Sequence, residues 1–165
     1  MRGFSERERR SEEASVALRI GSAVALLAAG CSGSPGSSVT HQRYAYTCCS
    51  APDVTRAWHP GQTLTLHWTA QPAGTTSAAA ARVTLTAVIT GPYRDVASLK
   101  SREPAASTLR SAPIVVGDQS GQQPESTIVL PAELQPGYYD LATRSEAASG
   151  NSAGGDSVIQ VTPTG

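Results

Sequence analysis

Cysteine and histidine are the side chains of this chain best suited to redox or metal chemistry, and both are scarce. The 165-residue sequence has three cysteines and three histidines, and Cys48 and Cys49 are adjacent in the stretch YAYTCCSAP. Neighbouring cysteines can serve as a redox centre, a metal site, a disulfide or simple packing groups. Which of these applies depends on the role of the third cysteine, Cys31.

An uncharged apolar run, IGSAVALLAAG, spans residues 20–30 and ends directly before Cys31. It is too short to cross a hydrocarbon layer of about 30 Å, but it has the length of the apolar region of a secretory signal. The small residues AAG before Cys31 resemble the lipobox of bacterial lipoproteins, in which the thiol is joined to diacylglycerol and a peptidase cuts just before it. The alternatives are a buried apolar helix and a plain signal peptide that ends near AAG.

The resemblance to lipoproteins implies a division of the chain into three parts. Residues 1–30 are expected to be the signal peptide, and residues 31–43 the lipidated cysteine with a flexible tether that includes the run SGSPGSSVT. Residues 44–165 are expected to form one folded domain. Acyl chains such as palmitate would hold this domain at the extracytoplasmic face of the cell membrane.

The composition excludes some classes of partner. Charged residues are 16% of the chain and the formal net charge is zero. A neutral chain with so few charges offers no broad basic surface for nucleic acid, and we expect no nucleic-acid partner.

The body of the chain carries the two-residue alternation of half-buried strands. In QTLTLHW, residues 62–68, the apolar side chains Leu64, Leu66 and Trp68 share one face. The run ARVTLTAVITG repeats the pattern over residues 81–91. Shorter candidate strands are APIVV (112–116), STIVL (126–130), YYDLATR (138–144) and DSVIQVTP (156–163), separated by turn-rich segments.

These strands resemble bacterial immunoglobulin-like or fibronectin-III-like modules. WHPGQTLTLHW is similar to their first core strand, and LPAELQPGYYDLATRS with SVIQVT is similar to their last two strands. The resemblance covers residues 57–163 and implies an all-β fold, a single immunoglobulin-like antiparallel β-sandwich of about seven strands. It also implies that Tyr139 packs at the sheet corner and hydrogen-bonds back to the chain.

Catalytic and metal sites find little support. The histidines are His41, His59 and His67, and no Gly-x-Ser-x-Gly elbow accompanies them. Although Cys48 and Cys49 lie near two histidines, adjacent side chains of an extended backbone point to opposite faces, which is poor geometry for chelation. We therefore expect no catalytic residue, no metal ligand, no cofactor and no enzymatic activity.

Surface recognition remains, and its candidates are three tyrosines and one long loop. Tyr44 and Tyr46 before the cysteines and Tyr93 after TGP are expected to be exposed. The stretch from Arg94 to Ser111 is expected to be a long loop, either a solvated connection or a binding loop. The candidate binding residues are Tyr93, Arg94, Lys100, Arg102 and Arg110.

The sequence thus predicts a membrane-anchored lipoprotein whose β-sandwich binds or scaffolds an envelope protein or polysaccharide. The alternative is a metal- or redox-linked envelope protein that uses Cys48, Cys49 and a nearby histidine. If Cys31 is lipidated, Cys48 and Cys49 are the remaining thiols facing an oxidising exterior. They would then form a vicinal disulfide with a distorted or cis peptide, or remain two thiols on opposite faces.

Overall fold

The computed structural model describes residues 38–101 and 103–164. Strands dominate this part of the chain, and its two helices have five residues each. In chain order the elements are β1 (His41–Cys48), α1 (Ala51–Thr55), β2 (Ala57–Trp58), β3 (Thr63–Thr76), β4 (Arg82–Tyr93), α2 (Val96–Lys100), β5 (Ser107–Arg110), β6 (Ile114–Gly117), β7 (Glu125–Val129), β8 (Gly137–Ala147) and β9 (Ser152–Val161). The prediction of an all-β fold is confirmed.

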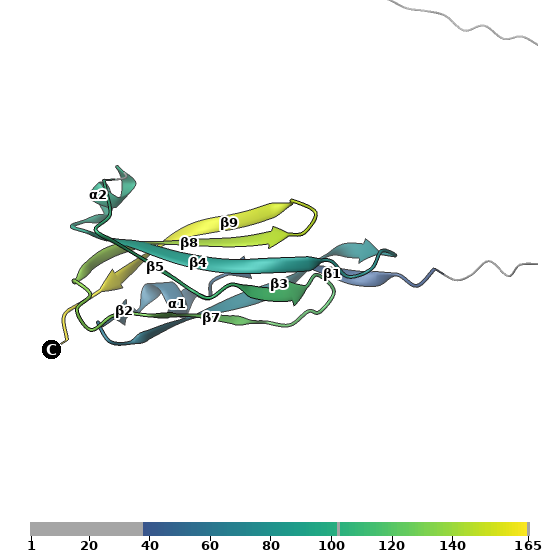
Figure 1. Ribbon diagram of the computed structural model, residues 1–165, viewed down its shortest axis with the longest axis horizontal. Helices are drawn as coiled ribbons and strands as arrows, with labels where there is room; N and C mark the ends of the chain where they lie inside the picture. Colours follow the sequence, from purple (N-terminus) through teal and green to yellow (C-terminus); the bar gives the residue numbers. More distant parts are fainter. Residues whose placement is uncertain (1–37, 102, 165) are drawn as a thin grey trace, which may run out of the picture. The chain divides into compact units, whose positions relative to one another are not determined.

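The strands form two sheets (Figure 1). The smaller sheet has the order β1-β3-β7, and both of its pairings are antiparallel. The larger sheet has the order β2-β9-β8-β4-β5, and β6 also pairs with β4. Its pairings are antiparallel except for β2, which runs parallel to the end of β9. The chain therefore crosses from the smaller sheet to the larger sheet between β1 and β2.

Strands β3 and β4 form because their sequences alternate between apolar and polar residues over a long stretch. Leu64, Leu66 and Trp68 on β3 are buried, and their neighbours point outward. Along β4, every second residue from Val83 to Tyr93 is buried. This period of two presents one apolar face of each sheet to the other sheet.

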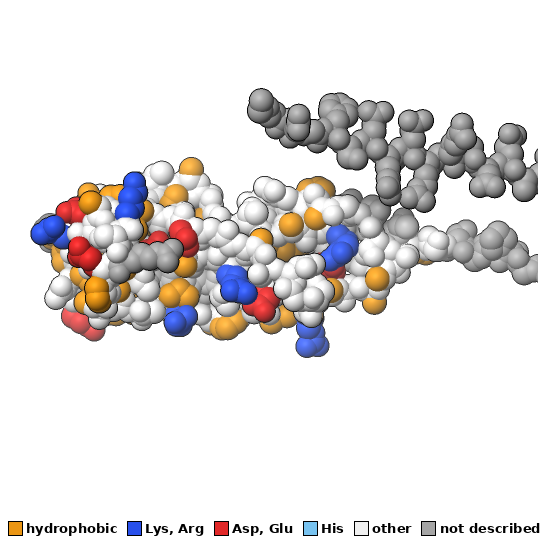
Figure 2. All heavy atoms as spheres, turned by 90° about the horizontal axis from the view of Figure 1, so that it is seen from above, with side chains coloured by type: hydrophobic (Ala, Val, Ile, Leu, Met, Phe, Trp, Pro, Cys, Tyr) orange, Lys and Arg blue, Asp and Glu red, His pale blue; other side chains and the backbone are white. Residues whose placement is uncertain are grey.

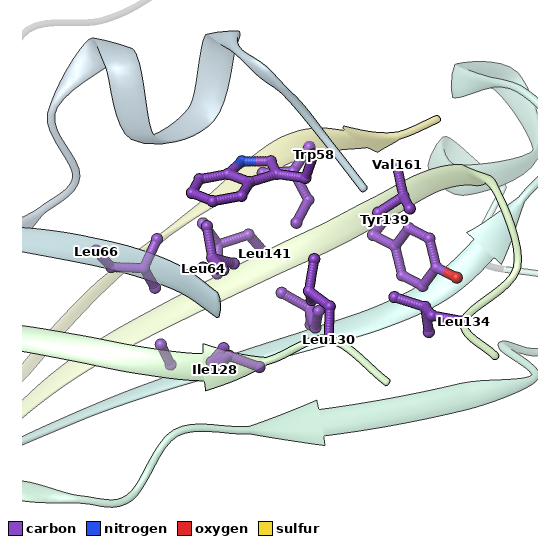
Figure 3. Packing of buried hydrophobic residues seen from close by; sticks show 12 residues of the cluster. Trp58, Leu64, Leu66, Ile128, Leu130, Leu134, Tyr139, Leu141 and Val161 are labelled. Carbon is purple, nitrogen blue, oxygen red and sulfur yellow. The ribbon is translucent and has the colours of Figure 1, made fainter. Parts of the chain in front are cut away.

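The core lies between the two inner faces (Figure 3). Its larger cluster is centred on Trp58, Leu64 and Tyr139, with aliphatic side chains from both sheets packed around them. A smaller cluster contains Tyr46, Trp68 and the first buried residues of β4. Because β2 carries Trp58, this two-residue strand contributes one of the largest buried side chains of the domain.

Tyr139 closes the core at the start of β8. Its ring is fully buried, and its hydroxyl donates a hydrogen bond of 2.6 Å to the carbonyl of Gln135. The prediction that this tyrosine hydrogen-bonds back to the chain is confirmed. Gly91 lies against the same ring, because a Cβ atom there would come within 2.6 Å of the Cδ1 atom of Tyr139.

Candidate functional site

A disulfide joins Cys48 and Cys49, and the peptide bond between these two residues is cis. Cys48 is the last residue of β1 and lies opposite Trp68 of β3. Both cysteines are partly buried and pack against the core, and Cys48 contacts both hydrophobic clusters. The chain leaves the smaller sheet at this disulfide and turns into α1.

The carboxylate of Asp53, on α1, accepts the backbone hydrogen bond from His67 of β3 in place of β1, which ends before it reaches this residue. It is 5% exposed, and its Oδ2 atom accepts hydrogen bonds from the backbone N–H groups of Ser50, at 3.0 Å, and His67, at 2.9 Å. His67 lies one residue before the last β1–β3 pair, where β1 has already ended. The carboxylate thus satisfies a strand N–H that would otherwise lack an acceptor.

The side chain of His67 is held by the same carboxylate. Its Nδ1 atom lies 2.8 Å from Oδ1 of Asp53. Because an ionised carboxylate only accepts hydrogen bonds, Nδ1 carries the proton and Nε2 is the nitrogen left to face outward. Nε2 lies 3.5 Å from Oε1 of Glu125, which stands opposite His67 on β7.

These contacts shift the pKa values of both Asp53 and His67. Burial raises the pKa of Asp53, but the hydrogen bonds from His67 and Ser50 outweigh it and hold the pKa below the ordinary 3.8. The hydrogen bond to Asp53 and the charge of that carboxylate raise the pKa of His67 above 6.5, with a smaller contribution from Glu125. The pair therefore favours an ionised aspartate beside a histidine that protonates readily.

A cavity of about 360 Å³ adjoins Asp53 and His67. Its lining includes Trp58, whose ring is covered by the guanidinium of Arg56 at 3.3 Å from the ring centroid. Trp58 is also tied to α1, because its indole N–H donates to the carbonyl of Asp53 at 3.2 Å. Pro52, Thr65 and His67 complete the lining with Asp53. We call the three side chains of Asp53, His67 and Glu125 the carboxylate–histidine cluster.

The candidate binding residues do not lie on one loop: Tyr93 ends β4, Lys100 ends α2 and Arg110 ends β5. Arg94 is exposed and forms an ion pair of 3.2 Å with Asp95. Arg110 lies opposite Val88 of β4. Arg102 lies outside the described residues. Basic and acidic side chains are interspersed at this end of the domain in Figure 2.

The stretch from Arg94 to Ser111 was expected to be one loop, but it contains α2 and β5. The expected exposure of two tyrosines is wrong. Tyr93 is 9% exposed because it continues the inward alternation of β4. Tyr46 is 2% exposed, and its hydroxyl reaches the carbonyl of Gly117 at 2.9 Å, which allows the ring to be buried. Tyr44 is partly buried.

The histidines that lie near the cysteines in sequence are not gathered around them. His41 lies at the opposite end of β1 from Cys48, which places it about 23 Å away along the strand at ~3.3 Å per residue. The Nδ1 atom of His59 lies 3.2 Å from the carbonyl of Thr162, at the C-terminal end of the described chain. Within residues 38–101 and 103–164, no group of three or more His, Cys, Asp or Glu side chains is placed to hold a metal ion.

The sequence analysis assigned no role to Asp53 or Glu125. A signal for Asp53 was present in the stretch SAPD, residues 50–53, which has the Ser-x-x-Asp spacing of a helix start. The partner of His67 across the sheet has no such local signal, because β3 and β7 are far apart in the chain.

The predicted lipidation site, Cys31, and the predicted signal peptide lie outside the described residues. Neither helix of the described part has the length and apolar character needed to cross a membrane. In the described part of the chain, β1 begins at His41, three residues ahead of the predicted domain start at residue 44.

No protein-family model and no curated protein matches the chain. Among solved structures, the sporulation control protein Spo0M from Bacillus subtilis has a TM-score of 0.41 and 12% identity, over 73% of this chain and 49% of that chain. A DUF4466 family protein from Parabacteroides merdae has a TM-score of 0.42 and 9% identity, over 74% of this chain and 46% of that chain. The chain thus spans about half the length of these two proteins. Its function has to be inferred from its own side chains.

Proposed function

We propose that this chain is a membrane-anchored extracytoplasmic lipoprotein whose β-sandwich is a binding or scaffolding module of the cell envelope. The observation that carries the proposal is the disulfide between Cys48 and Cys49. Disulfides persist in oxidising compartments and are rare where thioredoxin and glutathione keep thiols reduced. The apolar run and the small residues before Cys31 resemble a lipobox and support acyl chains on Cys31 as the membrane anchor.

The sandwich is proposed to be immunoglobulin-like, with about seven principal strands and β2 and β6 as short additions. The strand orders support this form, since β1-β3-β7 corresponds to the A-B-E sheet of such domains and β9-β8-β4-β5 to the G-F-C-C′ sheet. The hydrogen bond from Tyr139 to Gln135 supports it as well, because it has the form of a tyrosine corner. The fold by itself names no ligand.

The partner is proposed to be an envelope protein or polysaccharide that contacts the α2–β5 end of the domain. Arg94, Lys100 and Arg110 supply exposed donors there. Chemical cross-linking in intact cells tests this proposal with the double variant Arg94→Glu/Arg110→Glu and the control Arg82→Glu, both of which keep Lys100, the only lysine of the chain, as the cross-linking amine. The double variant should lose the cross-linked species and the control should keep it; equal cross-linking by all three chains would contradict the proposal.

Lipidation is tested by growing a lipoprotein-processing bacterium with an alkyne-labelled fatty acid and expressing the full chain. The wild-type chain should carry label in the membrane fraction, and the variant Cys31→Ser should carry none. The double variant Cys48→Ser/Cys49→Ser is the matched control and should keep the label. Label that survives in Cys31→Ser would contradict the proposed anchor.

A redox- or metal-linked role for the cysteine pair is the second candidate. It is favoured by the position of His67, which is next to Trp68, the residue of β3 that pairs with Cys48. Both sulfurs are held in the S–S bond, so metal binding through them would first require reduction to thiolates. If the double variant Cys48→Ser/Cys49→Ser keeps the stability, metal content and cross-linked partner of the wild type, this second candidate fails.

A further inference from the structure

When its ring is neutral, His67 of the carboxylate–histidine cluster presents a nitrogen lone pair to a carboxylate. Asp53 holds the proton on Nδ1 of His67, so Nε2 of the neutral ring is an acceptor. It faces Oε1 of Glu125, which also only accepts when ionised. Two acceptors in this arrangement repel each other unless a positive charge lies between them.

The distance between these two atoms leaves room for a metal ion. A charge-assisted hydrogen bond between imidazolium and carboxylate has a length of about 2.7–2.9 Å, whereas Nε2 and Oε1 are 3.5 Å apart. Two ligands of a tetrahedral ion at about 2.1 Å from the metal are separated by about 3.4 Å. A single ion can therefore contact both atoms with almost no movement of either side chain.

The remaining features of the cluster match those of a metal-binding histidine. A ligating histidine usually donates its other ring N–H to a carboxylate, which fixes the ring and makes the ligand nitrogen more basic. Asp53 does this from a position that is 5% exposed, while His67 and Glu125 are 52% and 58% exposed at the surface. The orienting group is thus buried and held by Ser50 as well, and both ligand side chains are open to solvent.

We propose that Nε2 of His67 and the carboxylate of Glu125 bind one divalent transition-metal ion of the zinc type, with Asp53 as the positioning residue. Imidazole with carboxylate favours zinc and copper over magnesium and calcium. Water completes the coordination, since the chain supplies two ligands. This site goes beyond the proposed anchoring and scaffolding role. It needs no thiolate, so it is also distinct from metal binding by the cysteine pair.

Calorimetric titration of Zn²⁺ into the full chain, without a histidine tag, tests the site. We expect one ion per chain, with an affinity in the roughly micromolar to millimolar range because the chain provides only two ligands. His67→Gln should abolish this binding, and Glu125→Gln should weaken it about tenfold or more. Asp53→Asn should weaken it by roughly 10–100-fold, as expected for loss of an orienting partner. His41→Gln and Glu146→Gln are the matched controls and should bind like the wild type.

Three results would overturn the proposal. The first is absence of Zn²⁺ binding by the wild type over this range, and the second is unchanged binding by His67→Gln. Unchanged binding by Glu125→Gln would be the third, since it would reduce the site to a lone surface imidazole. If Asp53→Asn does not fold, ¹⁵N chemical shifts of the wild type decide the geometry: Zn²⁺ must shift Nε2 of His67, and a primary shift at Nδ1 or at another histidine contradicts the assignment.

Discussion

Replacement of Asp53 by alanine removes the hydrogen bonds that join α1 to β3. The carboxylate accepts the backbone N–H groups of Ser50 and His67 and the ring N–H of His67. Each buried donor left without an acceptor costs about 1–3 kcal/mol, and partial exposure of these donors places each cost near the lower end. We therefore expect Asp53→Ala to lower the free energy of unfolding by about 2–4 kcal/mol.

Urea denaturation, followed by tryptophan fluorescence, measures this loss, and an unchanged m-value shows that the unfolding transition is the same. Asp95→Ala is the matched control, because Asp95 caps a helix of the same length but its side chain is 46% exposed. The control should lose less stability than Asp53→Ala. A loss in Asp53→Ala that is no greater than in the control would refute the bridging role of this carboxylate.

The loss should also depend on pH in a definite direction. The pKa of Asp53 in the folded protein lies below its ordinary value of 3.8. The ionised carboxylate therefore contributes its stability above that value, and the contribution disappears as the pH falls through the folded pKa. The gap between wild type and Asp53→Ala should be largest near about pH 5, where His67 is protonated and Asp53 is ionised, and should shrink toward about pH 3. A gap that stays constant down to about pH 3 would contradict the reasoning.

In the metal-free protein, NMR titration should give His67 a pKa above 6.5. The stabilising contribution of the protonated ring is then full below pH 6.5 and is lost as the pH rises through the folded pKa. A pKa at or below 6.5 would contradict the ion pair with Asp53. Tyr139→Phe should cost about 1–2 kcal/mol in urea unfolding, because the carbonyl of Gln135 loses its donor, and a cost near zero would count against a corner role. Gly91→Ala should destabilise by about 2 kcal/mol or more, because the added methyl group meets the ring of Tyr139, whereas Gly117→Ala has open space and should be near neutral. Equal effects of the two alanine substitutions on the thermal midpoint would argue against the close approach.

The strands could be predicted from the sequence because apolar residues, which are buried, alternate with polar residues along each long strand. Leu64, Leu66 and Trp68 occupy alternate positions and are buried together, as the pattern QTLTLHW indicates. The same reasoning holds for β4. It fails for β2, whose two residues are too few to show a period and which is held by pairing with β9 at the far end of the chain. The buried Trp58 therefore had no local signal for its place in the core.

The cluster could not be predicted because its members come from three elements. Asp53 and His67 are fourteen residues apart and meet only because α1 turns back after the disulfide. Glu125 reaches the site through the register of β3 with β7. His67 by itself has the appearance of a solvated strand residue, and its exposure agrees with that interpretation. What distinguishes it is the buried carboxylate behind the ring, which is a tertiary contact.

Mass spectrometry of the full chain recovered from bacterial membranes, without reduction, tests the central claim most directly. The account predicts a mature chain that begins at Cys31, carries acyl chains on that residue, and is lighter by two hydrogens at Cys48–Cys49 than the reduced form. It also predicts that alkylating reagents modify neither of these two cysteines before reduction. A chain with an unmodified Cys31 thiol, or with Cys48 and Cys49 both open to alkylation, would contradict an anchored protein in an oxidising compartment.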